Sequence, residues 1–332
     1  MTVKPGPSAL LSPVAAFITL AVAWAVARAG ADLAAGGQIG GFWLLVVLPA
    51  PLLVAVAWGR AAWAETRLWR LAVSVVAWLA AGYLLLSAAD TWQMTANVAA
   101  GLVAGAAWRR GWRPDVALAG VALVLAPLLI WAVVQMPVRE QLAAITDQSL
   151  KMLEQQAPPG TDPAELAKAR EIGRQRFAQL TDLTARLYPS LIGTGLLGQA
   201  VVILLLVRVT GRKLVTVPSP RRLPPFAQWR LPFYVVWALA VGIGLMITRK
   251  APLADAGLNL SVLAAALLSV QGLSVQYHLS RRFLPPAGLV IYWTLMGLAF
   301  VPLVVTSVLL GLADQWRDLR RLDSGANDAG SQ

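Results

Sequence analysis

The chain has 332 residues, of which 58% are hydrophobic and only 13% are charged, and its mean hydropathy is +0.65. Soluble proteins carry about 25% charged residues, so this composition is typical of a membrane protein. The chain has no cysteine and a single histidine, His278, which excludes disulfides, thiolate chemistry and a multi-histidine metal site within one chain.

Apolar segments recur along most of the chain, and each is close to the length of about 20 residues that a membrane-spanning helix needs. They predict an all-α, polytopic transmembrane bundle of about nine spans, of which the fourth, Ala96–Ala107, is shorter than this length. The first segment also has some features of a signal peptide, but its length favours a retained helix. The expected spans are Leu10–Ala29, Phe42–Trp58, Leu71–Ala88, Ala96–Ala107, Val116–Met136, Tyr188–Val207, Leu231–Ile247, Leu258–His278 and Gly288–Leu310.

The formal net charge of +12 is explained by where the basic residues lie. Cytoplasmic loops of membrane proteins carry an excess of lysine and arginine, and here half of the 28 basic residues fall in alternate gaps between spans. This pattern predicts a multi-pass protein of the bacterial inner membrane with a cytoplasmic N-terminus. The basic residues in these gaps are Arg60, Arg67, Arg70, Arg109, Arg110, Arg113, Arg208, Arg212, Lys213, Arg221, Arg222, Arg230, Arg281 and Arg282.

The longest gap, residues 137–187, is predicted to be an extracytoplasmic helical hairpin. Val138–Gln156 has apolar residues near helical spacing, and Pro158-Pro159-Gly160 then ends the helix. Thr161-Asp162-Pro163 provides a capping residue and a proline for the start of a second helix. A packed cap without a ligand, a surface for a partner and a gating role are all consistent with this pattern.

The inner loop Gly211–Arg230 is basic and rich in proline, which favours an extended segment. We expect its arginines to lie against anionic lipid headgroups, at about 1 kcal/mol for each residue. Because membrane topology already explains this cluster of charges, nucleic-acid binding is not expected.

The end of the chain allows two topologies. With nine spans the tail lies outside, although it contains Arg317, Arg320 and Arg321. With eight crossings, Pro302 breaks the last apolar segment into two short helices that return the tail to the cytoplasm, because proline removes a backbone donor and kinks a helix. The nine-span topology is the main prediction and the eight-span topology is the alternative.

No predicted span contains an acidic residue well inside it, which argues against a carboxylate relay at the membrane midplane. We therefore assign no catalytic residue, metal or cofactor, and an enzyme is not expected. The chain also lacks a Gly-x-x-x-x-Gly-Lys phosphate loop, so any use of ATP requires another protein.

Uncharged polar side chains inside the spans are the candidate ligand-binding residues. An amide surrounded by hydrocarbon needs a hydrogen-bond partner, so these side chains should face other helices or a cavity. They therefore either join helices, at about 0.6 kcal/mol each, or line a pocket for a small polar molecule. The candidates are Gln199, Tyr234, Asn259, Gln271 and Gln276.

The last span ends in a charged motif, where Asp314, Trp316 and Arg317 leave the bilayer together. Asp314 can pair with Arg317, or Asp318 with Arg321, at i,i+3 on an emerging helix. The motif is either a stop signal with an anchor or a contact for a partner protein or the inner loop. The sequence thus divides into membrane helices in 1–136, the hairpin in 137–187, membrane helices in 188–316 and a tail in 317–332 that we expect to be disordered.

Three motifs carry a family resemblance: Trp229-Arg230-Leu231-Pro232, Gln271-Gly272-Leu273-Ser274-Val275, and Gly311 to Arg320. Together they resemble the YybS-like family of bacterial integral membrane proteins, which has no assigned activity. Its first spans are distantly similar to the substrate-binding components of energy-coupling-factor vitamin transporters. That similarity implies that small residues of the first helix contact an energising membrane protein; the matching positions here are Ala21, Ala23, Ala25 and Ala27.

The resulting hypothesis is a transporter-like or small-ligand-binding membrane component without its own ATPase. The alternative is a membrane interaction or assembly protein that presents its outer hairpin and its basic inner loop to envelope partners.

Overall fold

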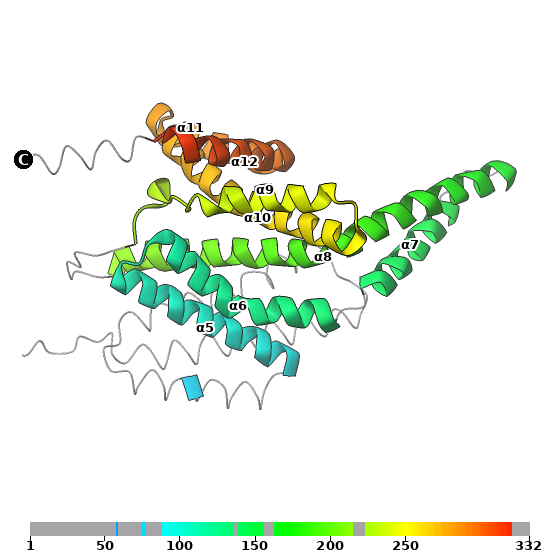
Figure 1. The fold of residues 1–332 in the computed structure, drawn as a ribbon, viewed down its shortest axis with the longest axis horizontal. Helices are drawn as coiled ribbons and strands as arrows, with labels where there is room; N and C mark the ends of the chain where they lie inside the picture. The colour runs from blue at the N-terminus through cyan, green and yellow to red at the C-terminus, as the bar shows by residue number, and fades with distance from the viewer. Residues whose placement is uncertain are drawn as a thin grey trace, which may run out of the picture. The chain divides into compact units, whose positions relative to one another are not determined.

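A computed structural model describes residues 88–135, 138–155, 163–214 and 223–320, together with residues 58, 75 and 76. Within these residues every element is a helix, which confirms the all-α prediction (Figure 1). The predicted spans before residue 88 fall almost entirely outside the described residues, as do Ala21 and Ala25. The elements are α5 (Ala88–Arg110), α6 (Pro114–Gln135), α7 (Val138–Gln155), α8 (Pro163–Leu214), η2 (Phe226–Gln228), α9 (Tyr234–Ile247), α10 (Ala251–Phe283), α11 (Pro286–Leu298) and α12 (Phe300–Arg317).

Several of these helices are long and apolar enough to cross a membrane. Among the described residues they are Pro114–Trp131 in α6, Arg170–Val209 in α8 and Ala251–Phe283 in α10, and the bent pair α11–α12 meets the same criterion as one unit. The apolar helix α9 is shorter, with 14 residues. These helices support a polytopic membrane protein, whereas the total number of crossings stays a prediction.

The helices belong to two compact units. Unit 1 contains residues up to Leu128, together with Gly195–Val235 and Ala266–Gln332. Unit 2 contains Leu129–Thr194 and Val236–Ala265. The long helices α8 and α10 each contribute residues to both units.

In unit 1, α5 and α6 form a tight helical hairpin (Figure 1). Gly111 has a φ of 62°, which glycine adopts without a steric penalty, and the Trp112 N–H donates to the Ala107 carbonyl at 3.0 Å. Beyond this turn Gly120 lies against Val103, where an added Cβ would be 3.2 Å from the valine. The small residue therefore lets the two helices approach closely.

In unit 2, α9 and α10 make a second close contact through glycines. A Cβ on Gly242 would lie 2.9 Å from the Gly257 carbonyl oxygen, and one on Gly257 would lie 2.8 Å from the Met246 nitrogen. Small residues allow the backbones of membrane helices to approach in this way. The short turn Thr248–Lys250 then fixes α9 and α10 as neighbours of opposite direction.

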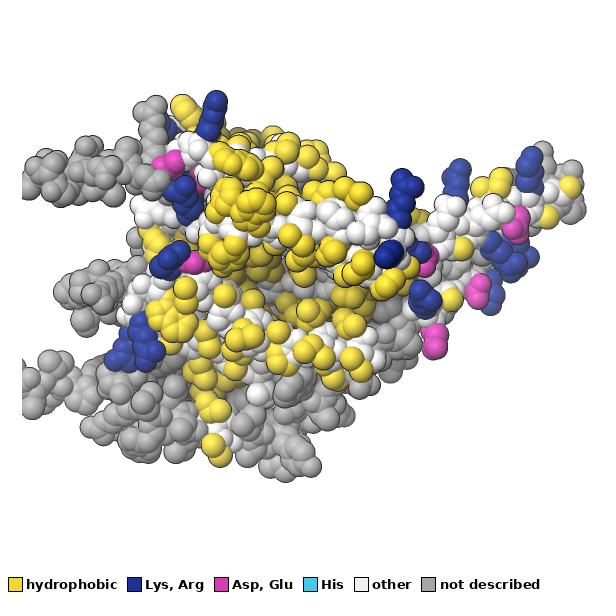
Figure 2. Space-filling view, viewed as in Figure 1, with side chains coloured by type: hydrophobic (Ala, Val, Ile, Leu, Met, Phe, Trp, Pro, Cys, Tyr) yellow, Lys and Arg dark blue, Asp and Glu magenta, His cyan; other side chains and the backbone are white. Residues whose placement is uncertain are grey.

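The predicted outer hairpin corresponds to α7 and the first part of α8, which lie side by side and carry most of their charges outward (Figures 1 and 2). The Arg139 and Asp182 side chains approach to 3.8 Å across the pair. By contrast, α9 exposes apolar residues, including Tyr234 at 66% and Trp237 at 63%. The two surfaces suit water and hydrocarbon respectively, but the side of the membrane on which the hairpin lies stays a prediction.

The last apolar segment is broken between α11 and α12, with an angle of 106° between the two helices. The main prediction was a single span here; the break lies at Ala299, three residues before Pro302, where the eight-span alternative placed it. Proline cannot donate to the carbonyl of Leu298, and its ring would collide with that group in a continuous helix. The helix therefore ends at Leu298, and Pro302 lies in the first turn of α12, where its missing N–H has no cost.

Candidate functional site

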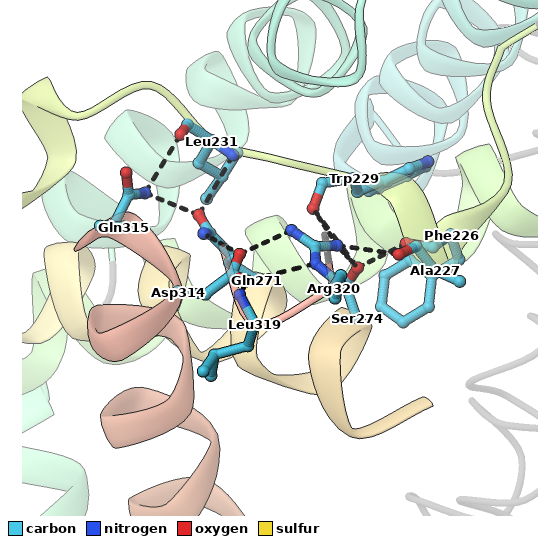
Figure 3. A network of polar contacts seen from close by, with 10 residues as sticks. All are labelled: Phe226, Ala227, Trp229, Leu231, Gln271, Ser274, Asp314, Gln315, Leu319 and Arg320. Carbon is cyan, nitrogen blue, oxygen red and sulfur yellow. Dashed lines mark hydrogen bonds and ion pairs between the residues drawn. The ribbon is translucent and has the colours of Figure 1, made fainter. Parts of the chain in front are cut away.

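The three motifs that carry the family resemblance meet in unit 1 and form one buried polar cluster (Figure 3). The first motif lies in the extended segment between η2 and α9, the second on α10, and the third at the end of α12. Gln271 and Ser274 are three residues apart, so they lie on the same face of α10. We call this group the tri-segment cluster; it consists of Phe226, Ala227, Trp229, Leu231, Gln271, Ser274, Asp314, Gln315, Leu319 and Arg320.

The ion pair between Asp314 and Arg320 is the centre of the cluster. The Arg320 Nη2 lies 2.7 Å from the Asp314 Oδ2, and the two side chains are 0% and 1% exposed. Helix α12 ends at Arg317, and Asp318 has a φ of 30°, which turns the chain back. The Leu319 N–H then donates to the Asp314 Oδ1 at 3.1 Å, so this carboxylate also caps the end of its own helix.

The rest of the Arg320 guanidinium binds the segment before α9. Its Nη1 donates to the Ala227 and Trp229 carbonyls, both at 2.9 Å, and to the Ser274 Oγ at 2.6 Å. These two carbonyls are free to accept because Trp229 is extended and η2 is only three residues long. The guanidinium has five N–H donors, and through them it joins α10 and α12 to the backbone carbonyls of the segment before α9.

The Gln271 side chain makes the second link. Its Nε2 donates to the Asp314 Oδ2 at 2.8 Å, and its Oε1 accepts from the Leu231 N–H at 3.1 Å. Gln315 donates through its Nε2 to the Gln271 Oε1 at 2.7 Å and to the Leu231 carbonyl at 3.1 Å. Both backbone groups of Leu231 are therefore satisfied by side chains rather than by a helix.

Two glycines bring α10 and α12 close enough for these bonds. A Cβ on Gly272 would overlap the backbone of Ser307, and one on Gly311 would overlap the Leu268 carbonyl. The two helices are therefore in direct backbone contact, as is usual where small residues line a membrane interface.

The charged and polar groups of the tri-segment cluster bind one another. Burying an ion pair is favourable only when further hydrogen bonds satisfy its remaining donors and acceptors, and here several do. Its chemistry suits a structural junction more than a reaction centre. Among the described residues there is no group of three or more histidine, cysteine or acidic side chains that could hold a metal.

The five predicted ligand-binding residues lie in different places. Gln271 belongs to the cluster, and Gln276 donates to Thr306 and Ser307 of α12 at 3.2 and 3.1 Å. Tyr234 is 66% exposed at the start of α9. Gln271 and Gln276 thus both lie at the contact of α10 with α12, where they bind different residues of α12.

The other two amides join pairs of helices. Gln199 of α8 donates to Asn97 of α5 in unit 1. In unit 2, the Asn259 Oδ1 accepts from the Ser190 N–H at 2.9 Å, and its Nδ2 donates to the Arg186 carbonyl at 2.8 Å. These contacts are those expected of residues that hold helices together, while ligand binding by either residue stays a prediction.

The residues predicted to contact a partner differ in exposure. Asp314 is fully buried, and its partner is Arg320 rather than the expected Arg317, because the chain turns back after Arg317. Trp316 is 61% exposed and packs against Phe233 with ring centroids 5.9 Å apart. Arg317 is also exposed.

Ser274, Gln315 and Arg320 were not among the predicted site residues. They lie within the motifs that carry the resemblance, but no spacing in the sequence predicts that they meet. Arg320 also falls in the segment that we expected to be a disordered tail, yet it is buried because Asp318 directs it back into the cluster.

The helices and their apolar surfaces define a polytopic α-helical membrane protein. Over residues 33–315 the chain matches the family described as Predicted membrane protein (DUF2232), and it belongs to that family. No curated protein and no solved structure matches the chain.

Proposed function

We propose that this protein is a transporter-like or small-ligand-binding membrane component that has no ATPase of its own. Its ligand would bind beside the broken helix pair α11–α12, where α10 presents the Gln276 amide. We also propose that it lies in the bacterial inner membrane with its N-terminus in the cytoplasm and its basic loops against anionic headgroups.

The observation that carries this proposal is the break at Ala299, where two apolar helices meet at 106°. Broken helices in membranes are tolerated where the irregular backbone is buried in protein or lines a water-filled cavity. In many transporters such helices form the substrate site. A helix that only anchors the chain or packs in a bundle does not require such a bend.

Gln276 supplies a second line of support. It is 5% exposed, and its amide nitrogen donates to two hydroxyls that themselves donate to the Pro302 and Leu303 carbonyls. This orientation leaves the buried Oε1 without a partner among the described residues. The Trp293 Nε1 of α11 is likewise buried without one. An unmet acceptor and an unmet donor suit a small polar ligand that has both kinds of group.

Purification in mild detergent tests the proposal, with Gln276→Leu as the variant and Ser261→Ala, on the same helix, as the control. Mass spectrometry of the denatured samples should find one small polar molecule with the wild type and with the control. We expect roughly tenfold less of it with Gln276→Leu, because the ligand loses an interaction of about 1.4 kcal/mol. Equal amounts in all three samples, or none in the wild type, would contradict the proposal.

The alternative function is membrane interaction or assembly, and the outer hairpin favours it. Ile172, Leu180 and Leu183 are 44, 57 and 49% exposed on the part of α8 that also carries many charges. Large apolar side chains exposed in an otherwise polar region are typical of a surface that binds another protein. A protein that co-purifies in equal amount, and is lost in Leu180→Ser, would favour this function.

A further inference from the structure

We infer that α11 and α12 form a re-entrant hairpin, so that the end of α12 lies at the same membrane surface as the segment Phe226–Leu231. Together with the crossings that the sequence predicts before residue 88, this gives eight crossings rather than nine. This inference depends on the contacts of the tri-segment cluster and does not depend on the proposed function.

The first step fixes the depth of two distant segments. Arg320 donates to the Ala227 and Trp229 carbonyls at 2.9 Å, and Gln315 donates to the Leu231 carbonyl at 3.1 Å. Groups within hydrogen-bonding distance lie at the same depth in a bilayer whose hydrocarbon core is about 30 Å thick. The number of crossings between residues 231 and 315 is therefore even.

The second step assigns two of these crossings to α9 and α10. The two helices are joined by the turn Thr248–Lys250 and pack through Gly242 and Gly257, so they run in opposite directions. The Leu231 N–H donates to Gln271 at 3.1 Å, which shows that α10 returns to the level from which α9 departs. At Gln271 the chain is therefore again at the depth of Leu231, and α10 continues from there to Phe283.

The third step concerns the remaining segment, which must cross either twice or not at all. Two crossings would need α11 and α12 to run antiparallel through the bilayer, and the bend between them does not fully reverse the direction of the chain. The bend of 106° at Ala299 also shows that α11 and α12 are not one continuous span. The pair therefore enters the membrane, turns and leaves on the same side.

The distribution of charge agrees with this topology. Arg281 and Arg282 precede α11, Arg317 is the last residue of α12, and Arg320 follows it. In the eight-span topology all four lie on the side of the basic inner loop, which is consistent with the excess of arginine in cytoplasmic loops, although Asp314 and Asp318 offset the last two charges. The nine-span topology would place Arg317 and Arg320 on the opposite side from that loop.

Single-cysteine labelling tests the inference, because the natural chain contains no cysteine. Ser219→Cys marks the inner loop, Ser324→Cys marks the tail and Gly160→Cys marks the outer hairpin. Each variant, expressed at full length in spheroplasts, is treated with a membrane-impermeant maleimide before and after permeabilisation. Ser331→Cys repeats the tail measurement at a second position.

We expect the cysteines at 219 and 324 to react only after permeabilisation, and the cysteine at 160 to react in intact spheroplasts. Reaction of positions 219 and 324 from the same side supports the hairpin. Reaction of these two positions from opposite sides would overturn it, whichever side each one faces. The proposed function is tested separately, by whether a small molecule co-purifies with the protein. The outcome of that experiment does not alter the labelling result.

Discussion

Arg320 brings a positive charge into a site where its guanidinium has no contact with water, and Asp314 is the counter-charge. Removing one partner of a buried ion pair leaves the other charge without compensation. We therefore predict that Arg320→Met lowers the free energy of unfolding by about 3–5 kcal/mol. The unfolding transition of the purified protein in detergent would measure this loss.

The matched control for that substitution is Arg317→Met, three residues earlier on the exposed side of α12. An exposed arginine contributes little, so this change should alter the free energy of unfolding by less than about 0.5 kcal/mol. Equal effects of the two substitutions would show that Arg320 is not buried against Asp314 and that the tri-segment cluster is incorrect.

For single residues, the sequence predicted which polar side chains need a partner but not which residues they contact. It singled out Gln271, because an amide near hydrocarbon requires a partner, and Asp314, because it belongs to the charged motif that ends the last span. The expected partner of Asp314 was Arg317, since helical periodicity allows only near neighbours to be paired. The true partner depends on the left-handed φ of 30° at Asp318, which local sequence patterns do not encode for a non-glycine residue.

Between elements, the contact of α10 with α12 depends on Gly272 and Gly311. A Cβ at position 272 would overlap the Ser307 backbone, which cannot yield as a flexible side chain can. We predict that Gly272→Ala destabilises the protein by about 1–3 kcal/mol, as overpacking does in other tightly packed cores. Thermal unfolding in detergent would detect the change.

The control is Gly244→Ala in α9, where nothing lies within 4 Å of the added Cβ. Alanine favours a helix over glycine by about 0.5–1 kcal/mol, so this variant should be as stable as the wild type or more so. If both substitutions had the same effect, the close approach of α10 and α12 would be refuted.

Helix positions were predictable where the signal is local. Hydropathy located the segments that became α6, α8 and α10, and the proline and capping residues near 158–163 located the gap between α7 and α8. The eight-span alternative placed the break in the last segment at Pro302 itself. The break lies at Ala299, because a proline disrupts the helical turn that precedes it. The effect of the break on topology could not be predicted, since it depends on contacts between residues more than 80 positions apart.

For the whole molecule, composition established the class of protein and the arrangement of arginines suggested a topology. Neither could distinguish eight crossings from nine, because the charge rule weakens near the tail, where acidic and basic residues alternate. The deciding information lies in the tri-segment cluster, which joins the end of α12 to the start of α9. The topological inference therefore depends on this one set of contacts.

Cross-linking in native membranes tests that set of contacts most directly. The double variant Ala227→Cys with Leu319→Cys, in a chain otherwise free of cysteine, would be treated with a short bis-maleimide and digested. We predict a linked peptide that joins the two segments, detected by mass spectrometry and absent from both single variants. If both cysteines react with the reagent but no linked peptide forms, the end of α12 does not lie against the segment before α9.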